Sequence, residues 1–267
     1  MFQSCRNWCL RLLRKRLILS LLIKGELFVN SRNFKLQTII NLYTIAQHLN
    51  FEAIDELVIL NVAREDKNID RFCEQVKEIA TNCFVPISAG GGVKSIEGFT
   101  KLLRSGADKI IINTAAIENP EFITQGAEIY GSQCLVVSVD VKKNREGIYE
   151  VYAHNGQQNT SIEVIDWVKQ IEELGGGEIY LTSIEQDGIG QGYDCKLVRT
   201  VADAVTIPVI ASGGVGEFDH LAEGIVEGNA SAVSLANLFH FIGHNLINAK
   251  KFLQSKDLGF PEPLWNF

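Results

Sequence analysis

The chain repeats part of its own sequence, and this repeat limits the folds that it can adopt. Three segments of the first half return in the second half in the same order, at offsets of 118 to 122 residues. The matching pairs are LILSLLIK (17–24) with LVVSVDVK (135–142), DELVIL (55–60) with GEIYLT (177–182), and VPISAGGGV (85–93) with IPVIASGGV (207–215). Such self-similarity predicts a fold made of two equivalent halves.

Short aliphatic runs alternate with longer amphipathic stretches along the sequence. Unbroken aliphatic runs are typical of buried parallel strands, and amphipathic stretches are typical of helices. The expected strands are Leu17–Ile23, Glu56–Asn61, Phe84–Ala89, Lys109–Asn113, Cys134–Asp140, Glu178–Ser183, Ile207–Ala211 and Ala230–Ala236. The expected helices are Ser95–Ser105, Asn119–Tyr130, Ser161–Leu174, Tyr193–Ala204 and Glu217–Glu227.

Eight strands that alternate with helices, without a linker rich in proline or serine, predict an α/β fold, a single-domain (β/α)8 TIM barrel with a twofold half-barrel repeat. We assign residues 14–267 to the barrel and residues 1–13 to an N-terminal extension. An open, doubly wound sheet is the alternative fold. Only one β-ribbon insertion is expected, near Gly147–Asn155 after the fifth strand.

The first aliphatic run, Leu17–Ile23, has three interpretations because several arginines and a lysine precede it. A secretory signal would need a cleavage site with small residues, whereas Lys24 and Glu26 follow this run. A membrane span would need roughly 20 apolar residues. The run has only seven. A buried strand is therefore the favoured interpretation, and no membrane contact is expected.

The composition narrows the classes of function. Hydrophobic residues make up 46% of the chain and charged residues 21%, which is ordinary for a globular protein. The net charge of -7 disfavours binding to nucleic acid, which requires a basic face. The six cysteines lack CxxC spacing and the five histidines lack the spacing of metal ligands. We therefore expect reduced thiols, a cytoplasmic protein, and neither a metal nor another cofactor.

Glycine-rich segments follow strands at equivalent places in the two halves. AGGGV (89–93) ends the third strand and ASGGV (211–215) the seventh, while INTAA (112–116) and ASAVSLANL (230–238) occupy the ends of the fourth and eighth. Loops at these strand ends form the active sites of TIM barrels, and glycine lets backbone N–H groups approach a ligand closely. The pattern predicts two phosphate sites on opposite sides of the barrel mouth; tight turns are the alternative.

A single acid, Asp140, closes the fifth strand and is a candidate general acid or base. A structural aspartate that accepts hydrogen bonds from loop amides is the alternative. The repeat places Leu22 at the equivalent position of the first strand. Because leucine cannot transfer a proton, a mechanism that needs paired carboxylates is impaired. Asp187-Gly188, after the sixth strand, is a further candidate or a plain turn.

Four charged residues, Arg16, Glu56, Lys109 and Glu178, stand at the starts of strands and therefore at the opposite end of the barrel. They are expected to pair, since a buried unpaired charge is costly. A solvated ring of salt bridges and a functional gate are equally compatible with this pattern.

Six motifs between about residues 16 and 241 point to one family. They are DELVIL (55–60), GGGV (90–93), GADKIIINTAAIENPEFI (106–123), GSQ-LVVSVD-K (131–142), GEIYLTSI-DG--GYD (177–194) and IPVIASGG (207–214). Together they resemble the cyclase subunit of imidazole glycerol phosphate synthase. The resemblance implies a glutaminase partner that docks on the barrel bottom. Ammonia then passes through the barrel to the top, where a substrate with two phosphates is aminated, cleaved and cyclised.

The resemblance also implies roles for individual residues. Asp140 matches one of two catalytic aspartates, and Leu22 occupies the position of the other. The charged gate at the ammonia entrance is implied for Arg16, Glu56, Lys109 and Glu178. The candidate residues for substrate and phosphate binding are Gly91, Gly92, Asn113 and Thr114 on one side, and Asp187, Gly188, Gly213, Gly214, Ala236 and Asn237 on the other.

The sequence departs from the family pattern at several positions. Besides Leu22, Ile189 replaces a threonine, Asn61 an aspartate and Asn237 a serine, and the loop of residues 25–37 follows the family pattern poorly. With these departures the chain resembles a diverged branch of the family found with surface-polysaccharide biosynthesis. In that branch the barrel and its glutaminase supply nitrogen to a sugar amidotransferase.

Three functional hypotheses follow. The favoured one is a barrel subunit that receives ammonia from a glutaminase and supplies it for nitrogen transfer to a surface-polysaccharide sugar precursor. The second is an active cyclase of histidine biosynthesis, a lyase that forms imidazole glycerol phosphate and AICAR with Asp140 alone. The third is a non-catalytic binding barrel.

Overall fold

The computed structural model describes residues 14–41, 53–65, 67–236 and 246–261, and within them eight parallel strands form a closed barrel. The strands are β1 (Arg16–Lys24), β4 (Glu56–Asn61), β5 (Ile87–Gly90), β6 (Lys109–Ile112), β7 (Leu135–Lys143), β10 (Glu178–Ser183), β11 (Val209–Ser212) and β12 (Ala232–Leu235). Pairing of β12 with β1, and of β7 with β10, closes the ring. The predicted TIM barrel is confirmed, and the open sheet is wrong.

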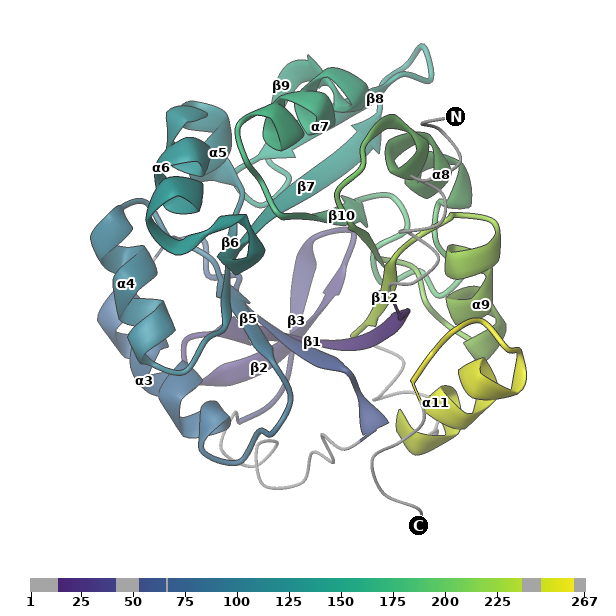
Figure 1. Cartoon of the computed structure of the whole chain (residues 1–267), viewed down its shortest axis with the longest axis horizontal. Helices are drawn as coiled ribbons and strands as arrows, with labels where there is room; N and C mark the ends of the chain where they lie inside the picture. Colours follow the sequence, from purple (N-terminus) through teal and green to yellow (C-terminus); the bar gives the residue numbers. More distant parts are fainter. Residues whose placement is uncertain (1–13, 42–52, 66, 237–245, 262–267) are drawn as a thin grey trace.

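Helices surround the barrel (Figure 1). They are α3 (Ile69–Ala80), α4 (Ile96–Arg104), α5 (Thr114–Glu118), α6 (Glu121–Tyr130), α7 (Val164–Glu173), α8 (Cys195–Ala204), α9 (Phe218–Val226) and α11 (Leu246–Ser255), with the short 3-10 helix η2 (Ser132–Cys134) before β7. Side chains of Asn68, Ser95 and Asp194 accept hydrogen bonds from the first free N–H groups of α3, α4 and α8. These caps fix where the three helices begin.

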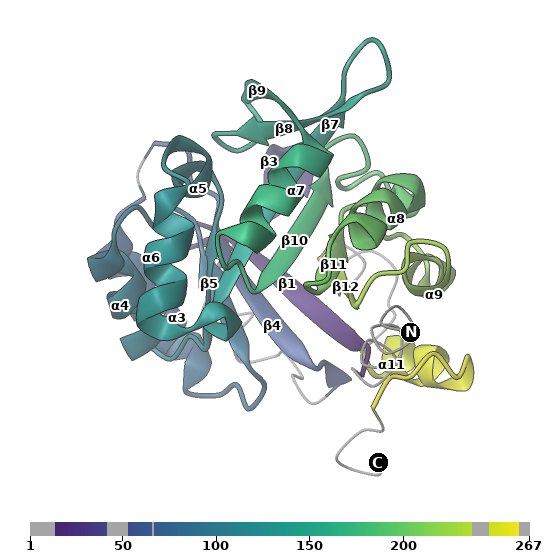
Figure 2. The same cartoon turned by 45° about the horizontal axis from the view of Figure 1, so that its top comes forward.

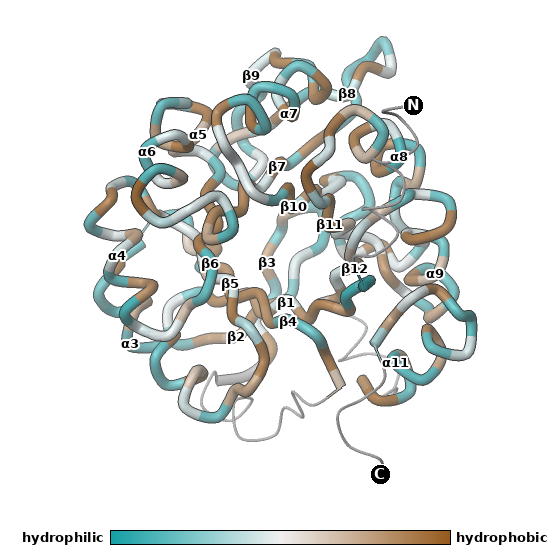
Figure 3. Tube along the Cα trace, viewed as in Figure 1, coloured by the Kyte–Doolittle hydropathy of each residue, from teal (hydrophilic) through white to brown (hydrophobic). Residues whose placement is uncertain are grey.

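Strand alternation divides the side chains of the barrel between two environments. On β1, Leu17, Leu19 and Leu21 belong to the main core between strands and helices, whereas Ile18 packs inside the barrel. Figure 3 shows hydrophobic segments on the strands and a mixture of hydrophobic and hydrophilic segments along the surrounding helices. The outer core therefore holds the helices on the barrel, and the interior positions remain available for polar and functional side chains.

The two halves are equivalent in structure as well as in sequence. Each half begins with a long strand that continues into an antiparallel hairpin: β2 (Leu27–Arg32) and β3 (Lys35–Asn41) after β1, and β8 (Tyr149–Ala153) and β9 (Gln158–Glu163) after β7. Leu22 pairs with Val29, and Asp140 pairs with Tyr152. Figure 2 shows the second hairpin extending beyond the ring of strands at one end.

The expectation of only one β-ribbon insertion is wrong. A second ribbon, formed by β2 and β3, follows the first strand, and its turn lies within residues 25–37. Asn33 and Phe34 both adopt positive φ, 49° and 61°, as the central residues of a type I′ turn do. Glycine normally occupies the second of these positions, so the phenylalanine conceals the turn in the sequence. The internal repeat was the available signal for this hairpin.

Several element boundaries also differ from those expected. The third strand begins at Ile87 instead of Phe84, which is 94% exposed. The helix expected from Ser161 begins at Val164, because residues 158–163 form β9. The helix expected from Asn119 begins at Glu121. A short helix that was not expected, α5, precedes it and ends where Asn119 leaves helical geometry at φ -141°. The expected extension, residues 1–13, lies outside the described residues.

The division of β1 side chains leads to a stability prediction. Leu21→Ala removes a side chain that is 1% exposed and should lower the free energy of unfolding by roughly 2–5 kcal/mol. Leu27→Ala, at a position 38% exposed, should change it by less than about 0.5 kcal/mol. Urea unfolding of both variants tests this assignment, and equal losses would contradict it.

Candidate functional site

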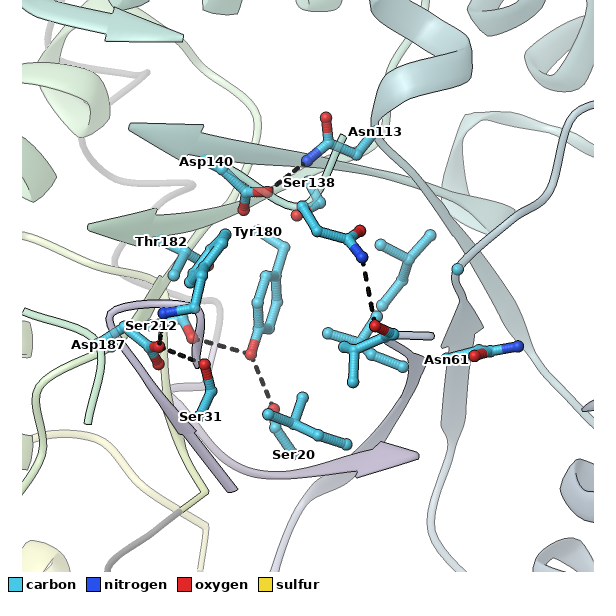
Figure 4. Close-up of a pocket in the computed structure, with 18 of the residues that line it drawn as sticks. Ser20, Ser31, Asn61, Asn113, Ser138, Asp140, Tyr180, Thr182, Asp187 and Ser212 are labelled. Atoms are coloured by element: carbon cyan, nitrogen blue, oxygen red, sulfur yellow. Dashed lines mark hydrogen bonds between the residues drawn. The ribbon is translucent and has the colours of Figure 1, made fainter. Parts of the chain in front are cut away.

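A cavity of about 610 Å³ opens at the C-terminal ends of the barrel strands. It extends from hydroxyl groups inside the barrel to the loops at its mouth (Figure 4). All the described candidates for catalysis and substrate binding line it: Leu22, Gly91, Gly92, Asn113, Thr114, Asp140, Asp187, Gly188, Gly213, Gly214 and Ala236. Asn237 lies outside the described residues. The strand-end pattern in the sequence thus located residues that share one cavity.

The two glycine turns border the cavity with bare backbone. A Cβ at Gly91 would lie 2.2 Å from the backbone oxygen of Asn61, and one at Gly214 would lie 2.0 Å from that of Gly192. Both glycines have positive φ, 107° and 115°. No other residue fits at these positions without moving the neighbouring backbone. The turns therefore present main-chain groups to the cavity, as an oxyanion or phosphate site requires.

Asp140 is the buried acid of the cavity, with 7% of its surface exposed. Burial, with a further contribution from the nearby Asp187 carboxylate, raises the pKa of Asp140 from its ordinary value to about 7. Hydrogen bonds from Asn113, at 2.8 Å, and Ser138 oppose this rise. The partners are side chains and not loop amides. A carboxyl group with a pKa near neutrality can both accept and donate a proton under physiological conditions.

Leu22 faces the same cavity from the opposite wall. β1 and β7 are separated by three strands on one side, β4, β5 and β6, and by β10, β11 and β12 on the other. Asp140 and Leu22 are therefore diametrically placed in the ring, and both line the cavity. The acid on one wall thus faces an aliphatic side chain on the other, and paired proton transfer from these two positions is impossible.

Three cations that line the cavity were missed in the sequence: Arg64, which donates to the backbone oxygen of Phe34, and Lys67 and Lys94, which lie on the side of Gly92. The Nζ of Lys67 donates to Asn155 at 3.2 Å. The Cβ and Cδ of Lys67 lie 2.7 Å and 2.9 Å from the place that a Cβ of Gly92 would take. Burial lowers the pKa of Lys67, and Lys94 lowers it further. Arg64 and Lys67 come three and six residues after the end of β4 at Asn61, so their place after a strand end was the signal that could have found them. Lys67 and Lys94 make the Gly92 side of the mouth suitable for an anionic ligand.

Asp187 anchors the first hairpin over the other side of the mouth. Its Oδ2 accepts hydrogen bonds from Ser31 Oγ at 2.5 Å and from the backbone N–H of Phe34 at 3.0 Å. Its backbone oxygen accepts from Asn33 N–H at 2.8 Å. Burial raises the pKa of Asp187, whereas Ser31 and Phe34 lower it. Asp187 is therefore more than a plain turn residue, and it holds the β2–β3 turn against the loop after β10.

The four charged residues at the opposite end form one network. Glu56 accepts from Arg16 at 2.7 Å and from Lys109 at 3.0 Å. Glu178 accepts from Lys109 at 3.0 Å and also pairs with Arg16. Burial opposes the charge of Arg16, but the two glutamates outweigh it and raise the pKa of Arg16. Two positive and two negative charges thus balance across the bottom of the barrel.

The part of the chain that the structure describes contains no group of three or more histidine, cysteine, aspartate or glutamate side chains placed to hold a metal ion. No helix within it is both long and apolar enough to cross a membrane.

The fold and the site define a class: a TIM barrel with two equivalent halves, a polar cavity at one end and an ion-pair network at the other. Comparison with known families identifies the family within this class. Residues 18–244 match the family described as "Histidine biosynthesis protein", which covers most of the chain. The chain belongs to the histidine biosynthesis protein family, in agreement with the resemblance found in the motifs.

The environment of Asp140 predicts a pH dependence of stability. Between about pH 4 and pH 7 the folded protein keeps a proton on Asp140 that the unfolded chain has released. The free energy of unfolding should therefore fall as pH rises through this window, by up to about 1.4 kcal/mol per pH unit. Asp140→Asn removes this contribution, so its stability should change less over the same window. Urea unfolding across this range tests it, and parallel curves for the two proteins would contradict it.

Proposed function

We propose that the chain is the cyclase-type barrel subunit of a glutamine-dependent amidotransferase complex. In this proposal a glutaminase docks at the barrel bottom and its ammonia passes the Arg16–Glu56–Lys109–Glu178 network and the barrel interior. The ammonia is then supplied in the cytoplasm for nitrogen transfer to a phosphorylated acceptor, a surface-polysaccharide sugar precursor. A separate sugar amidotransferase completes the transfer.

The observation that carries this proposal is the charged network placed on the barrel axis opposite the cavity. The side chains of Glu56 and Glu178 are 2% and 6% exposed, so two carboxylates are buried at the end of a barrel core that would ordinarily be apolar, and the partly exposed Arg16 and Lys109 pair with them. Burying two carboxylates and part of their two cationic partners brings a desolvation cost that a purely structural plug of aliphatic residues would avoid. A functional reason for retaining them is an entrance that opens when a partner rearranges the pairs.

The surface around this entrance also favours a partner. Phe84 precedes β5, while Ile129 and Val226 lie in the last turns of α6 and α9, all toward the N-terminal ends of the strands. Their exposed fractions are 94%, 57% and 59%. The exposed large hydrophobic side chains of the two hairpin regions, Leu27, Ile39 and Ile148, are only 36% to 38% exposed. The greater apolar exposure around the entrance therefore favours a protein interface there.

Asp140 faces the aliphatic Leu22 across the cavity instead of a second acid, and this favours ammonia supply over ring closure. The family reaction implied by the motifs uses two aspartates, and loss of a proton-transfer group typically costs about 10²–10⁴ in rate. A working cyclase is the second candidate, because Asp140 and both glycine turns remain in the cavity.

The partner is tested by glutamine hydrolysis with a glutaminase subunit of the imidazole glycerol phosphate synthase type. The full chain should stimulate hydrolysis at least about tenfold. Phe84→Ser should weaken the complex by about tenfold or more, because it removes an exposed aromatic anchor. Ile148→Ser, at an exposed position in the hairpin at the other end, is the matched control and should bind normally. Absence of both stimulation and complex formation would favour the non-catalytic binding barrel.

A further inference from the structure

An apolar layer inside the barrel separates the charged network from the cavity. It consists of Ile18, Val58, Ile111, Val136, Tyr180, Ile210 and Ala232, each at most 3% exposed. Only Ile111 and Tyr180 of this layer also line the cavity. A molecule that moves from the network to the cavity must therefore pass this layer. Desolvation makes such a passage far more costly for an ammonium ion than for neutral ammonia.

On the cavity side of this layer, four hydroxyl groups from four strands meet. Tyr180 extends from β10 into the barrel interior, and its Oη lies 2.8 Å from Ser20 Oγ, 3.0 Å from Ser234 Oγ and 2.9 Å from Ser212 Oγ. Ser20 and Ser234 are themselves 2.6 Å apart. Figure 4 shows the tyrosine side chain in the middle of the cavity, with Ser20 and Ser212 near its hydroxyl group. We call these four groups the hydroxyl cluster.

Hydrogen-bond counting shows what the hydroxyl cluster offers to a ligand. Each hydroxyl group carries one proton to donate and two lone pairs to accept. The cluster contains four hydroxyl groups and four internal hydrogen bonds, so every proton is already used. The remaining lone pairs make the cluster an acceptor without free donors. Its natural ligand is a small molecule that donates several hydrogen bonds.

We propose that the hydroxyl cluster of Ser20, Tyr180, Ser212 and Ser234 is a binding site for one molecule of neutral ammonia. This inference rests on the proposed passage of ammonia through the barrel and adds the place where ammonia is held after the apolar layer. Ammonia carries three N–H groups on one small atom, so one molecule can donate to several of these oxygens at once in competition with water. The site lies on the route between the network and Asp140, since both the cluster and Asp140 line the cavity.

The tyrosine makes the site selective for the neutral molecule. Burial raises the pKa of the Tyr180 phenol, so the group stays uncharged and gives no negative partner to an ammonium ion. Ser20, Tyr180 and Ser234 are each at most 3% exposed, which limits the water that could stabilise a cation there.

The test observes Tyr180 directly by NMR of the full chain labelled with ¹³Cζ-tyrosine, which gives six signals. The signal that Tyr180→Phe removes is the signal of Tyr180. Titration with ammonium chloride at about pH 9, where much of the ammonium is deprotonated, should shift this signal saturably. Three control titrations should give no saturable shift. They are ammonium chloride at the same total concentration and about pH 6.5, sodium chloride at about pH 9, and trimethylamine at about pH 9.

Two serine variants complete the design. Ser234→Ala removes one member of the cluster and should weaken the ammonia response at least about tenfold. Ser105→Ala, whose hydroxyl group bonds to the backbone of α4 outside the barrel, is the matched control and should respond like the parent chain. A linear response, a response that follows total ammonium at both pH values, or an unchanged response in Ser234→Ala would each overturn the site.

This experiment is independent of the glutaminase. A saturable ammonia response without glutaminase stimulation would support the site while removing its proposed partner. Stimulation without the ammonia response would leave the complex standing and refute the hydroxyl cluster as a binding site.

Discussion

Closure of eight parallel strands, through the pairing of β7 with β10 and of β12 with β1, decides where every functional side chain lies. In a closed barrel alternate residues of each strand must point inward, and they stack in layers along the axis. On β10 this places Glu178 in the charged network, Tyr180 in the apolar layer and hydroxyl cluster, and Thr182 in the cavity. A one-residue shift in register would exchange all three for outward-facing residues.

The same rule explains how much the sequence predicted. The aliphatic runs predicted the barrel strands, the glycine turns predicted the cavity residues, and the repeat predicted that Leu22 and Asp140 occupy equivalent positions. All three features depend on local sequence pattern and on strand register. The β2–β3 hairpin was missed because Phe34 occupies a positive-φ position normally given to glycine. The cluster around Tyr180 was missed because it joins four strands, and no sequence spacing indicates which inward residues meet across a barrel.

The proposed function depends on the contrast between the two ends of the axis. The end that would face a glutaminase keeps four balanced charges, whereas the cavity keeps only one of two equivalent acids. The cavity is still suited to an anion, with Lys67 and Lys94 on one side of its mouth. A barrel that has the charged network and the glycine turns but lacks the second acid is, in our proposal, better suited to supplying ammonia than to closing a ring.

The most direct test of this account is turnover of the family's bisphosphorylated formimino-ribulosyl imidazole-carboxamide substrate with saturating ammonium salt and no glutaminase. Under our proposal free ammonia does not need the route through the barrel interior, so the assay isolates the chemistry at Asp140 and Leu22. The account predicts no turnover by the parent chain and measurable turnover by Leu22→Asp, which restores the second acid. Turnover by the parent chain at about one per second or faster would contradict it and identify a working cyclase.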